Sequence, residues 1–539
     1  MKLPSFGPGR VEDEVVSFLA GLLSEVAEVV EVAIRARTGR RRTLPVRALL
    51  VALLILATEG RPLHLLEATK LLYRRLSVSS RTLLCVPGVV TGTKSLLARY
   101  RCVRYLFHRI CEVMDPSGEK RNRVLPVALA ASLHSPLAPE QSQRRLELLE
   151  AVVHSLVSSS VSVLKDQELA AFAGSVGLDA TPVPLYSRGP SKRAGTCASD
   201  PDGGWYVRRP AERTGEDHKG RVREKVVWAL EATLVTMSRR PGAVPSHPNL
   251  VLGLALARPG EDPGGIGVRL LASLSRSGYP AGFLGADRGY TQANPERFHL
   301  PVRALGYLPV MDYKTNELGR QASSQGALLV DGCFYCPAMP VPLVEASADL
   351  RAGRIDNKTY ERLVEVRAKW RLVRKSGPDQ DGYERFSCPA IGNHPKLCCP
   401  LRPSDKAIGK LPVLVPPTIP PRLCTQSAVT IAPDIGARHR QEIAFGTKEW
   451  ASAYAIPRNT VEGWNGYLKD TAHEALAAPD RRRVRGIAAQ SIFCAMLVMA
   501  GNLRKVGAYR DLVADGALER VAARARRRRT SLRDHLPGP

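Results

Sequence analysis

Between residues 175 and 311 the sequence alternates short apolar segments of strand length with two segments of helical periodicity. In chain order these are three strands, a helix, a fourth strand, a short helical stretch and a fifth strand. Gly, Pro and Ser residues bound the strand segments, as is typical of turns. The expected strands are Ser175–Tyr186, Val226–Met237, Leu250–Ala257, Gly282–Ala286 and Tyr307–Met311. This order predicts an α/β domain with a mixed five-stranded sheet flanked by helices.

Two aspartates stand at the predicted ends of apolar strands. Asp179 lies in Gly-Leu-Asp-Ala-Thr on the first strand, and Asp287 lies in Gly-Ala-Asp-Arg-Gly-Tyr after the fourth. A carboxylate at the end of a buried strand is costly unless a partner such as a metal ion compensates it. Two hard divalent ions need shared carboxylates, so the pair is a candidate metal site. Either aspartate alone has an ordinary alternative role in a turn or a helix cap.

A third candidate acid, Glu462, lies on a helix that we expect to begin at Pro457, because proline is favoured at the first helical position. At about 100° per residue, Arg458, Glu462 and Lys469 fall on one side of this helix. A neighbouring apolar stripe would pack on a sheet and consists of Val461, Trp464 and Leu468. The acid could bind a metal ion while the two bases hold DNA phosphates. The alternative is a surface ion-pair array, since Arg458 and Glu462 are four residues apart.

Together these segments resemble the insertion-sequence DDE transposases, in the branch with an inserted segment between the second aspartate and the glutamate. That family places its first acid in Asp-x-Thr and its second in Asp-x-Gly-Tyr, matched here by Asp179, Thr181, Asp287, Gly289 and Tyr290. Its third acid stands in Tyr-x2-Arg-x3-Glu-x6-Lys, and the residues that match in spacing are Arg458, Glu462 and Lys469. Tyr454 lies one residue too far upstream for the tyrosine of that signature.

The resemblance implies an RNase H-like catalytic core that binds two Mg²⁺ or Mn²⁺ ions through Asp179, Asp287 and Glu462. It also implies cleavage of double-stranded DNA at element ends, transfer of the freed 3′-hydroxyl into target DNA, and a homodimer in the DNA-bound complex. The residues expected to contact DNA are Arg458, Lys469, Arg288 and Tyr454. Two alternatives stay open: a transposase-derived DNA-binding protein that has lost catalysis, and an RNase H-like nuclease without strand transfer.

Changes in composition and hydrophobic periodicity along the sequence predict five sections. Residues 1–165 are helical and basic and suit DNA binding, with a plain helical packing domain as the alternative. The catalytic domain would comprise residues 172–314 and 446–510, separated by a β-rich insertion rich in Cys and Pro at residues 315–445. Residues 511–539 form a basic tail with an arginine run at Arg524–Arg529.

The insertion carries the one cysteine pattern that suggests a metal. Cys333-x2-Cys336 is followed by Cys388, the pair Cys398–Cys399 and Cys424. A zinc site at Cys333, Cys336, Cys388 and Cys399 would fit the tetrahedral thiolate chemistry of this ion. Free buried cysteines are the alternative, because the second half lacks a clean CxxC.

Charge bears on the partner. Lys and Arg total 78 against 51 Asp and Glu, a formal net charge of +27. Such an excess favours a polyanionic partner such as DNA, although charge that only maintains solubility is the alternative. The apolar runs are shorter than a membrane span and no secretory signal is visible, so we expect a cytoplasmic protein without a membrane partner. His218 and His299 are expected to be structural or surface residues. Trp205 and Tyr206 could stack on an unpaired base or serve in a hairpin.

Overall fold

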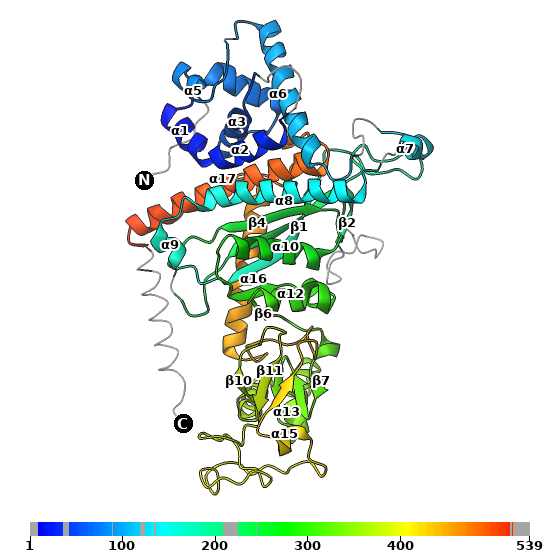
Figure 1. Cartoon of the computed structure of the whole chain (residues 1–539), viewed down its shortest axis with the longest axis vertical. Helices are drawn as coiled ribbons and strands as arrows, with labels where there is room; N and C mark the ends of the chain where they lie inside the picture. Colours follow the sequence, from blue (N-terminus) through cyan, green and yellow to red (C-terminus); the bar gives the residue numbers. More distant parts are fainter. Residues whose placement is uncertain are drawn as a thin grey trace.

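The computed structural model describes residues 9–35, 43–88, 90–118, 124–133, 136–208, 225–243, 245–517 and 520. Three tiers follow one another along its long axis: N-terminal helices, a helix-covered mixed sheet, and a module with two small sheets (Figure 1). The chain is thus a mixed α/β protein, as predicted. Most of the basic segment at residues 35–42, His218 and the arginine run at residues 524–529 lie outside the described residues.

The first tier is helical in its described part. Its helices are α1 (Asp13–Leu22), α2 (Ser24–Ala33), α3 (Val46–Thr58), α4 (Leu65–Lys70), α5 (Val78–Leu83) and α6 (Thr93–Met114). The chain continues through α7 (Val127–Leu133), α8 (Pro139–Val161) and α9 (Asp166–Ala170), of which α8 lies along α17 (Ile487–Ala514) and against β4 (Val251–Ala257) of the sheet (Figure 1). Every residue of α3 except Arg47 is buried. Helix α3 packs against α17, a long helix near the end of the described residues. One apolar core therefore joins the front of the chain to its end.

The central sheet is mixed. Its strands are β1 (Val176–Pro184), β2 (Gly204–Arg208), β3 (Lys225–Met237), β4 (Val251–Ala257), β5 (Phe283–Ala286) and β6 (Leu308–Val310). β3 is antiparallel to β1, whereas β1, β5 and β6 are parallel neighbours. β2 and β4 both pair antiparallel with β3.

The sheet has six strands where the sequence predicted five. The extra strand, β2, begins at the end of the segment 189–204, which reads as a loop of Gly, Ser, Pro and Asp. β3 is long enough to pair with β4 over residues 231–236 and with β2 over residues 225–229. Trp205 also packs edge-on against Trp228, with ring centroids 5.2 Å apart. The length of β3 therefore provides a pairing edge that local composition did not reveal.

Helices cover both faces of the sheet. On one face α16 (Lys448–Lys469) crosses β1, β3 and β5, and α17 packs beside it. The opposite face is covered by α10 (Pro263–Arg276), where Leu178 of β1 meets Gly267. Because side chains alternate along a strand, residues 177, 179 and 181 point to the α16 face. The smaller helices after β5 are α11 (Arg288–Thr291) and α12 (Leu300–Ala304).

The insertion forms the third tier and contains helices as well as strands. One three-stranded sheet comprises β7 (Arg320–Ser324), β8 (Ala327–Val330) and β9 (Cys333–Tyr335), and the other comprises β10 (Val373–Ser376), β11 (Glu384–Ser387) and β12 (Val429–Ile431). Its helices are α13 (Val341–Arg351), α14 (Asn357–Arg367) and α15 (Arg422–Thr425). An ion pair between Arg367 and Asp331 at 2.5 Å is almost fully buried in this module.

By length and composition alone, α17 could cross a membrane. However, 89% of its most apolar 18-residue window is buried inside the fold. It lies alongside α8 and against β4. This burial is that of a core helix that joins the N-terminal tier to the sheet.

Candidate active site

Helix α16 comes close to the sheet because two glycines face it. A Cβ on Gly177 of β1 would overlap the Pro457 carbonyl oxygen, and a Cβ on Gly285 of β5 would lie 2.8 Å from Pro457 Cβ. Any larger residue at either position would push the helix away. Pro457 therefore marks the crossing point of α16 over β1 and β5.

The predicted start of this helix was wrong. Pro457 lies inside α16, which begins at Lys448. The Thr447 side chain caps the helix by accepting a hydrogen bond from the Trp450 N–H at 3.1 Å. An interior proline removes one N–H from the helical ladder and its ring crowds the preceding turn, so the contacts of Pro457 with the sheet must offset that cost. The preference for proline at the first helical position was misleading here.

Asp179 lies within β1, so the prediction that it stands at the end of its strand was wrong. β1 continues to Pro184 because its pairing with β3 extends that far. Asn465 of α16 donates a hydrogen bond from Nδ2 to Asp179 Oδ2 at 2.9 Å. The Asn465 Oδ1 atom is buried and has no hydrogen-bond partner among the described residues. The carboxylate thus faces α16 inside the protein.

The charge on Asp179 is destabilised by its surroundings. Burial, followed by the nearby Asp287 carboxylate, raises the pKa of Asp179 to about 6, although the Ala180 N–H and Arg458 act in the opposite direction. Glu462 adds a smaller upward effect on this pKa. The acids are therefore close enough to repel one another. A cation between them would relieve this repulsion.

Asp287 directly follows β5, as predicted. Its side chain accepts a hydrogen bond from the Gly289 N–H at 2.8 Å and so caps the short helix α11. Asp287 therefore caps a helix through Oδ1 and at the same time lines the cavity beside Asp179.

Glu462 forms an ion pair with Arg458 at 2.7 Å, and its side chain is 47% exposed. Although burial opposes it, Tyr454, Glu462, Asp179 and Asp287 together raise the pKa of Arg458. The guanidinium thus lies among the three acids. In the described part of the chain, no three His, Cys, Asp or Glu side chains already surround one point closely enough to hold a metal ion. The ion pair between Arg458 and Glu462, which the sequence analysis gave as the alternative to a metal site on this helix, is therefore present in the structure.

The three acids share one cavity of about 540 Å³. The cavity is lined by Asp179, Ala180, Thr181, Pro182, Tyr206, Asp287, Arg458, Glu462, Asn465, Gly466 and Lys469. Lys469 and Arg458, both predicted to contact DNA, lie in its wall. The structure therefore brings five of the seven predicted active-site residues into one cavity.

Arg288 and Tyr454 do not line this cavity. Arg288 forms an ion pair with Asp312 at 2.6 Å. Tyr454 stacks on Trp450 with ring centroids 5.3 Å apart, and burial raises its pKa. Both lie beside the site and position α11 and α16 in this conformation.

Two further polar residues belong to the cavity wall. Asn465 was missed in the sequence, although it lies three residues after Glu462 and so faces the same side of the helix. Tyr206 lines the cavity, whereas its neighbour Trp205 packs on Trp228. Only Tyr206 of this pair is therefore placed for stacking on a ligand in the cavity.

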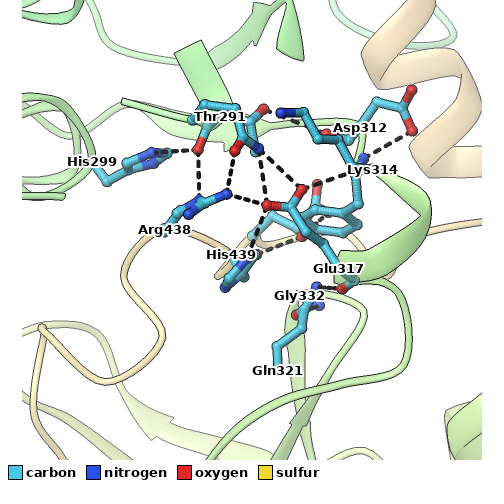
Figure 2. Close-up of polar contacts among 12 residues, drawn as sticks. Thr291, His299, Asp312, Lys314, Glu317, Gln321, Gly332, Arg438 and His439 are labelled. Carbon is cyan, nitrogen blue, oxygen red and sulfur yellow. Dashed lines mark hydrogen bonds and ion pairs between the residues drawn. The ribbon is translucent and has the colours of Figure 1, made fainter. Parts of the chain in front are cut away.

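A polar network ties the end of the insertion to the segment after β5 (Figure 2). Arg438 donates to the Thr291 carbonyl oxygen at 3.2 Å and also to the Glu317 carboxylate. His299 is fully buried, with Nε2 3.3 Å from the Thr291 carbonyl oxygen. Burial, followed by Arg303, lowers the pKa of His299 to about 3, so it is neutral and structural as predicted. The network fixes α11, and with it the chain around Asp287.

All four cysteines predicted for zinc lie in one buried cluster of the insertion, but only three of them interact through their sulfur atoms. The Cys336 thiol is hydrogen-bonded to Cys388, and Cys399 and Cys424 each interact electrostatically with Cys388. The Cys333 thiol instead contacts the Gln441 carbonyl oxygen at 3.5 Å. Because β9 turns Cys333 toward Gln441, Cys333 is replaced in the group by Cys424.

Comparison of the chain with family models, with curated proteins and with solved structures found no match in any of the three.

Proposed function

We propose that the chain is a DNA transposase of the DDE type, which cleaves DNA and transfers strands with the help of divalent metal ions. The observation that carries this proposal is the meeting of Asp179, Asp287 and Glu462 in one cavity whose wall also contains Arg458 and Lys469. These residues come from three distant segments, and the sequence pattern alone had singled them out. A chance surface array would not require three separate segments to meet.

The sheet supports an RNase H-like assignment for the central tier. Read across the sheet, the order is β4, β3, β1, β5 and β6, with β3 antiparallel to the parallel group β1, β5 and β6. An RNase H-like domain has this order, with an acid on its first strand and another after its fourth. Here those positions belong to Asp179 and Asp287, when β2 is counted as an addition to the edge of β3.

The donor set fits Mg²⁺ or Mn²⁺. Asp179, Asp287 and Glu462 offer hard carboxylate oxygens, and the raised pKa of Asp179 indicates that the pair of aspartates lacks full charge compensation. Glu462 would have to turn from Arg458 to join them. When bound, the ions would activate the attacking water or 3′-hydroxyl and stabilise the leaving oxygen.

The protein residues have separate tasks in this proposal. Asn465 orients Asp179 through its Nδ2 hydrogen bond. Arg458 partly neutralises the acids when no ion is bound, and it can then pair with a DNA phosphate once Glu462 turns away. Lys469 lies at the same wall and supplies a second positive charge for the backbone. Double-stranded DNA is the proposed partner, and a homodimer would join two element ends.

A catalytically retired DNA-binding protein is the second candidate, and a specific observation favours it. The Glu462 carboxylate is held by Arg458, and the described residues contain no preformed group of three acids. A protein that only binds DNA would keep the basic residues and could keep this ion pair permanently. The net charge of +27 serves both candidates equally.

Cleavage of a supercoiled plasmid that carries the native flanking DNA tests the proposal. Wild type with Mn²⁺ should produce cuts with 3′-hydroxyl ends, and Asp179→Ala should produce none. Glu361→Gln, an exposed acid on α14 outside the cavity, is the matched control and should cut normally. Tight DNA binding without metal-dependent cutting would instead establish the retired protein. Cutting without strand transfer into a second plasmid would indicate a nuclease.

A further inference from the structure

Three Cys-Pro dipeptides in the insertion begin turns of the same kind. In each turn the cysteine carbonyl oxygen accepts a hydrogen bond from the N–H three residues later, at 2.9 to 3.2 Å. The donor and acceptor pairs are Met339 to Cys336, Ile391 to Cys388 and Arg402 to Cys399. In each turn the N–H two residues after the cysteine is also hydrogen-bonded to its sulfur, the donors being Ala338, Ala390 and Leu401.

This turn geometry stabilises a thiolate. A backbone N–H directed at sulfur favours the charged form, and the proline sets the bend without adding a competing donor. Thiolate, and not thiol, is the form that binds metal ions. One such turn would be unremarkable, but here three occur in a single module.

The cysteines of the three turns meet a fourth from α15. The Cys336 thiol is hydrogen-bonded to Cys388, and both belong with Cys399 and Cys333 to one buried cluster. Burial, followed by the charges of Cys388 and Cys399, raises the pKa of Cys424. Four sulfurs from four separate segments therefore approach one another.

A partly buried arginine accompanies the four sulfurs. Arg402 interacts electrostatically with Cys388, Cys399 and Cys424. One of its terminal nitrogens donates to the Gln426 carbonyl oxygen at 2.8 Å, which links the third turn to the end of α15. Its Nε atom is buried without a hydrogen-bond partner in the described part of the chain. Arg402 is therefore placed to offset the negative charge that several thiolates around one divalent ion would carry.

We propose that Cys336, Cys388, Cys399 and Cys424 bind one structural Zn²⁺ ion with tetrahedral geometry. Four thiolates close the coordination sphere, which is the arrangement of structural and not catalytic zinc. In the structure the Cys336 thiol is hydrogen-bonded to Cys388, and among the described residues no three potential ligands yet surround a common point. Zinc binding would therefore require side-chain rotation, about backbone turns that are already formed at Cys336, Cys388 and Cys399.

The segment between β11 and β12 explains why an ion is needed there. It runs from residue 388 to residue 428 and contains α15 as its only helix or strand among the described residues. A connection of this length without regular structure is uncommon in a compact module unless something fixes it. Cys388, Cys399 and Cys424 lie along it, while Cys336 follows β9 on the other sheet. The ion would thus pin this long loop to both small sheets, independently of whether the chain is a transposase.

Metal analysis of the purified full-length chain tests the proposal. Protein expressed with zinc should contain one Zn²⁺ per chain by elemental mass spectrometry. Cys399→Ser and Cys424→Ser should each lose it, whereas Cys398→Ser and Cys333→Ser should retain it. Cys333→Ser is the sharper control, since the CxxC spacing names Cys333 as a ligand and the structure does not. Loss of zinc from Cys333→Ser as complete as from Cys424→Ser would overturn the assignment.

A measurement on the wild-type chain avoids any variant that fails to fold. Co²⁺ in place of Zn²⁺ should give the intense visible bands of a tetrahedral site and a thiolate-to-cobalt charge-transfer band. Absence of both bands and of stoichiometric zinc would refute the site. Titration of free thiols after unfolding in a chelator should find all 11 cysteines. Two missing thiols in zinc-free protein would instead show a disulfide, and its assignment to Cys336 and Cys388 by peptide mapping would exclude the zinc proposal.

Discussion

Replacing Asp179 with Asn should stabilise the metal-free protein at neutral pH. The pKa of Asp179 is raised from 3.8 to about 6, chiefly by burial and by Asp287. A shift of roughly two units between the unfolded and folded states corresponds to about 3 kcal/mol of folding free energy at pH 7.5. Asn keeps an oxygen that can accept the hydrogen bond from Asn465 but carries no charge. The variant should therefore gain up to about 3 kcal/mol.

The pH dependence of this gain follows from the direction of the shift. The folded protein holds its Asp179 proton more tightly than the unfolded chain does. Wild-type stability is thus highest below pH 3.8, falls as the pH rises to about 6, and is constant above that for this group. Asp179→Asn removes this fall, so the two proteins should differ little below about pH 4 and fully above about pH 7.

Thermal unfolding in a chelator, followed from pH 4 to pH 8, measures the effect. For a domain of the size expected for residues 172–314 and 446–510 together, about 3 kcal/mol corresponds to a change of roughly 6–12 °C in melting temperature. Saturating Mn²⁺ should then stabilise wild type alone and reduce or reverse the difference, because the ion binds only the folded carboxylate site. Equal melting temperatures of the two proteins at pH 8 in chelator would refute the argument that Asp179 carries an uncompensated charge.

The remaining predictions concern packing, catalysis and DNA affinity. Gly177→Ala should lower the free energy of unfolding by about 1–3 kcal/mol or more in a denaturant titration, because the added Cβ would overlap the Pro457 carbonyl oxygen. Gly463→Ala on α16 is the control: an added Cβ there would meet no atom within 4 Å, so this variant should be neutral or stabilising. Glu462→Gln should abolish cleavage and leave DNA affinity by fluorescence anisotropy equal or tighter, and a large drop in affinity would mean that the acid is structural. Truncation after Glu519 should weaken binding to all DNA sequences alike and reduce the salt dependence of that binding. The slope of log affinity against log salt concentration should fall in magnitude by about 0.9 for each phosphate that the tail neutralised. An unchanged slope would exclude a phosphate-binding tail.

Periodicity was enough to predict most of the sheet and the succession of its strands. Apolar runs flanked by turn residues located five of the six central strands, because burial on both faces leaves a clear signal. β2 was not visible, since its pairing depends on how far β3 extends and not on its own composition. The first strand was predicted at nearly its observed length, but Asp179 was wrongly placed at its end, since β1 pairs with β3 as far as Pro184.

The acids of the site could be predicted from sequence, but their surroundings could not. Short sequence motifs that can be recognised without knowledge of the fold contain Asp179, Asp287 and Glu462. The ion pair of Glu462 with Arg458, the hydrogen bond from Asn465 and the ion pair of Arg288 with Asp312 depend on how side chains settle in the folded protein. Among the cysteines, the CxxC spacing suggested Cys333, whereas the thiol of this residue contacts the Gln441 carbonyl oxygen in the folded protein.

Helix α16 connects the insertion to the cavity that contains the three acids as one helix of 22 residues, about 33 Å long. One end is anchored in the insertion, where Trp450 contacts Phe445 with ring centroids 4.4 Å apart. The other end carries Glu462, Asn465 and Lys469, and the helix touches the sheet most closely at Pro457. Any tilt of the insertion relative to the sheet would therefore turn the helix about this point of contact. Glu462 would then move toward or away from the two aspartates, so that the orientation of the insertion sets the position of this acid.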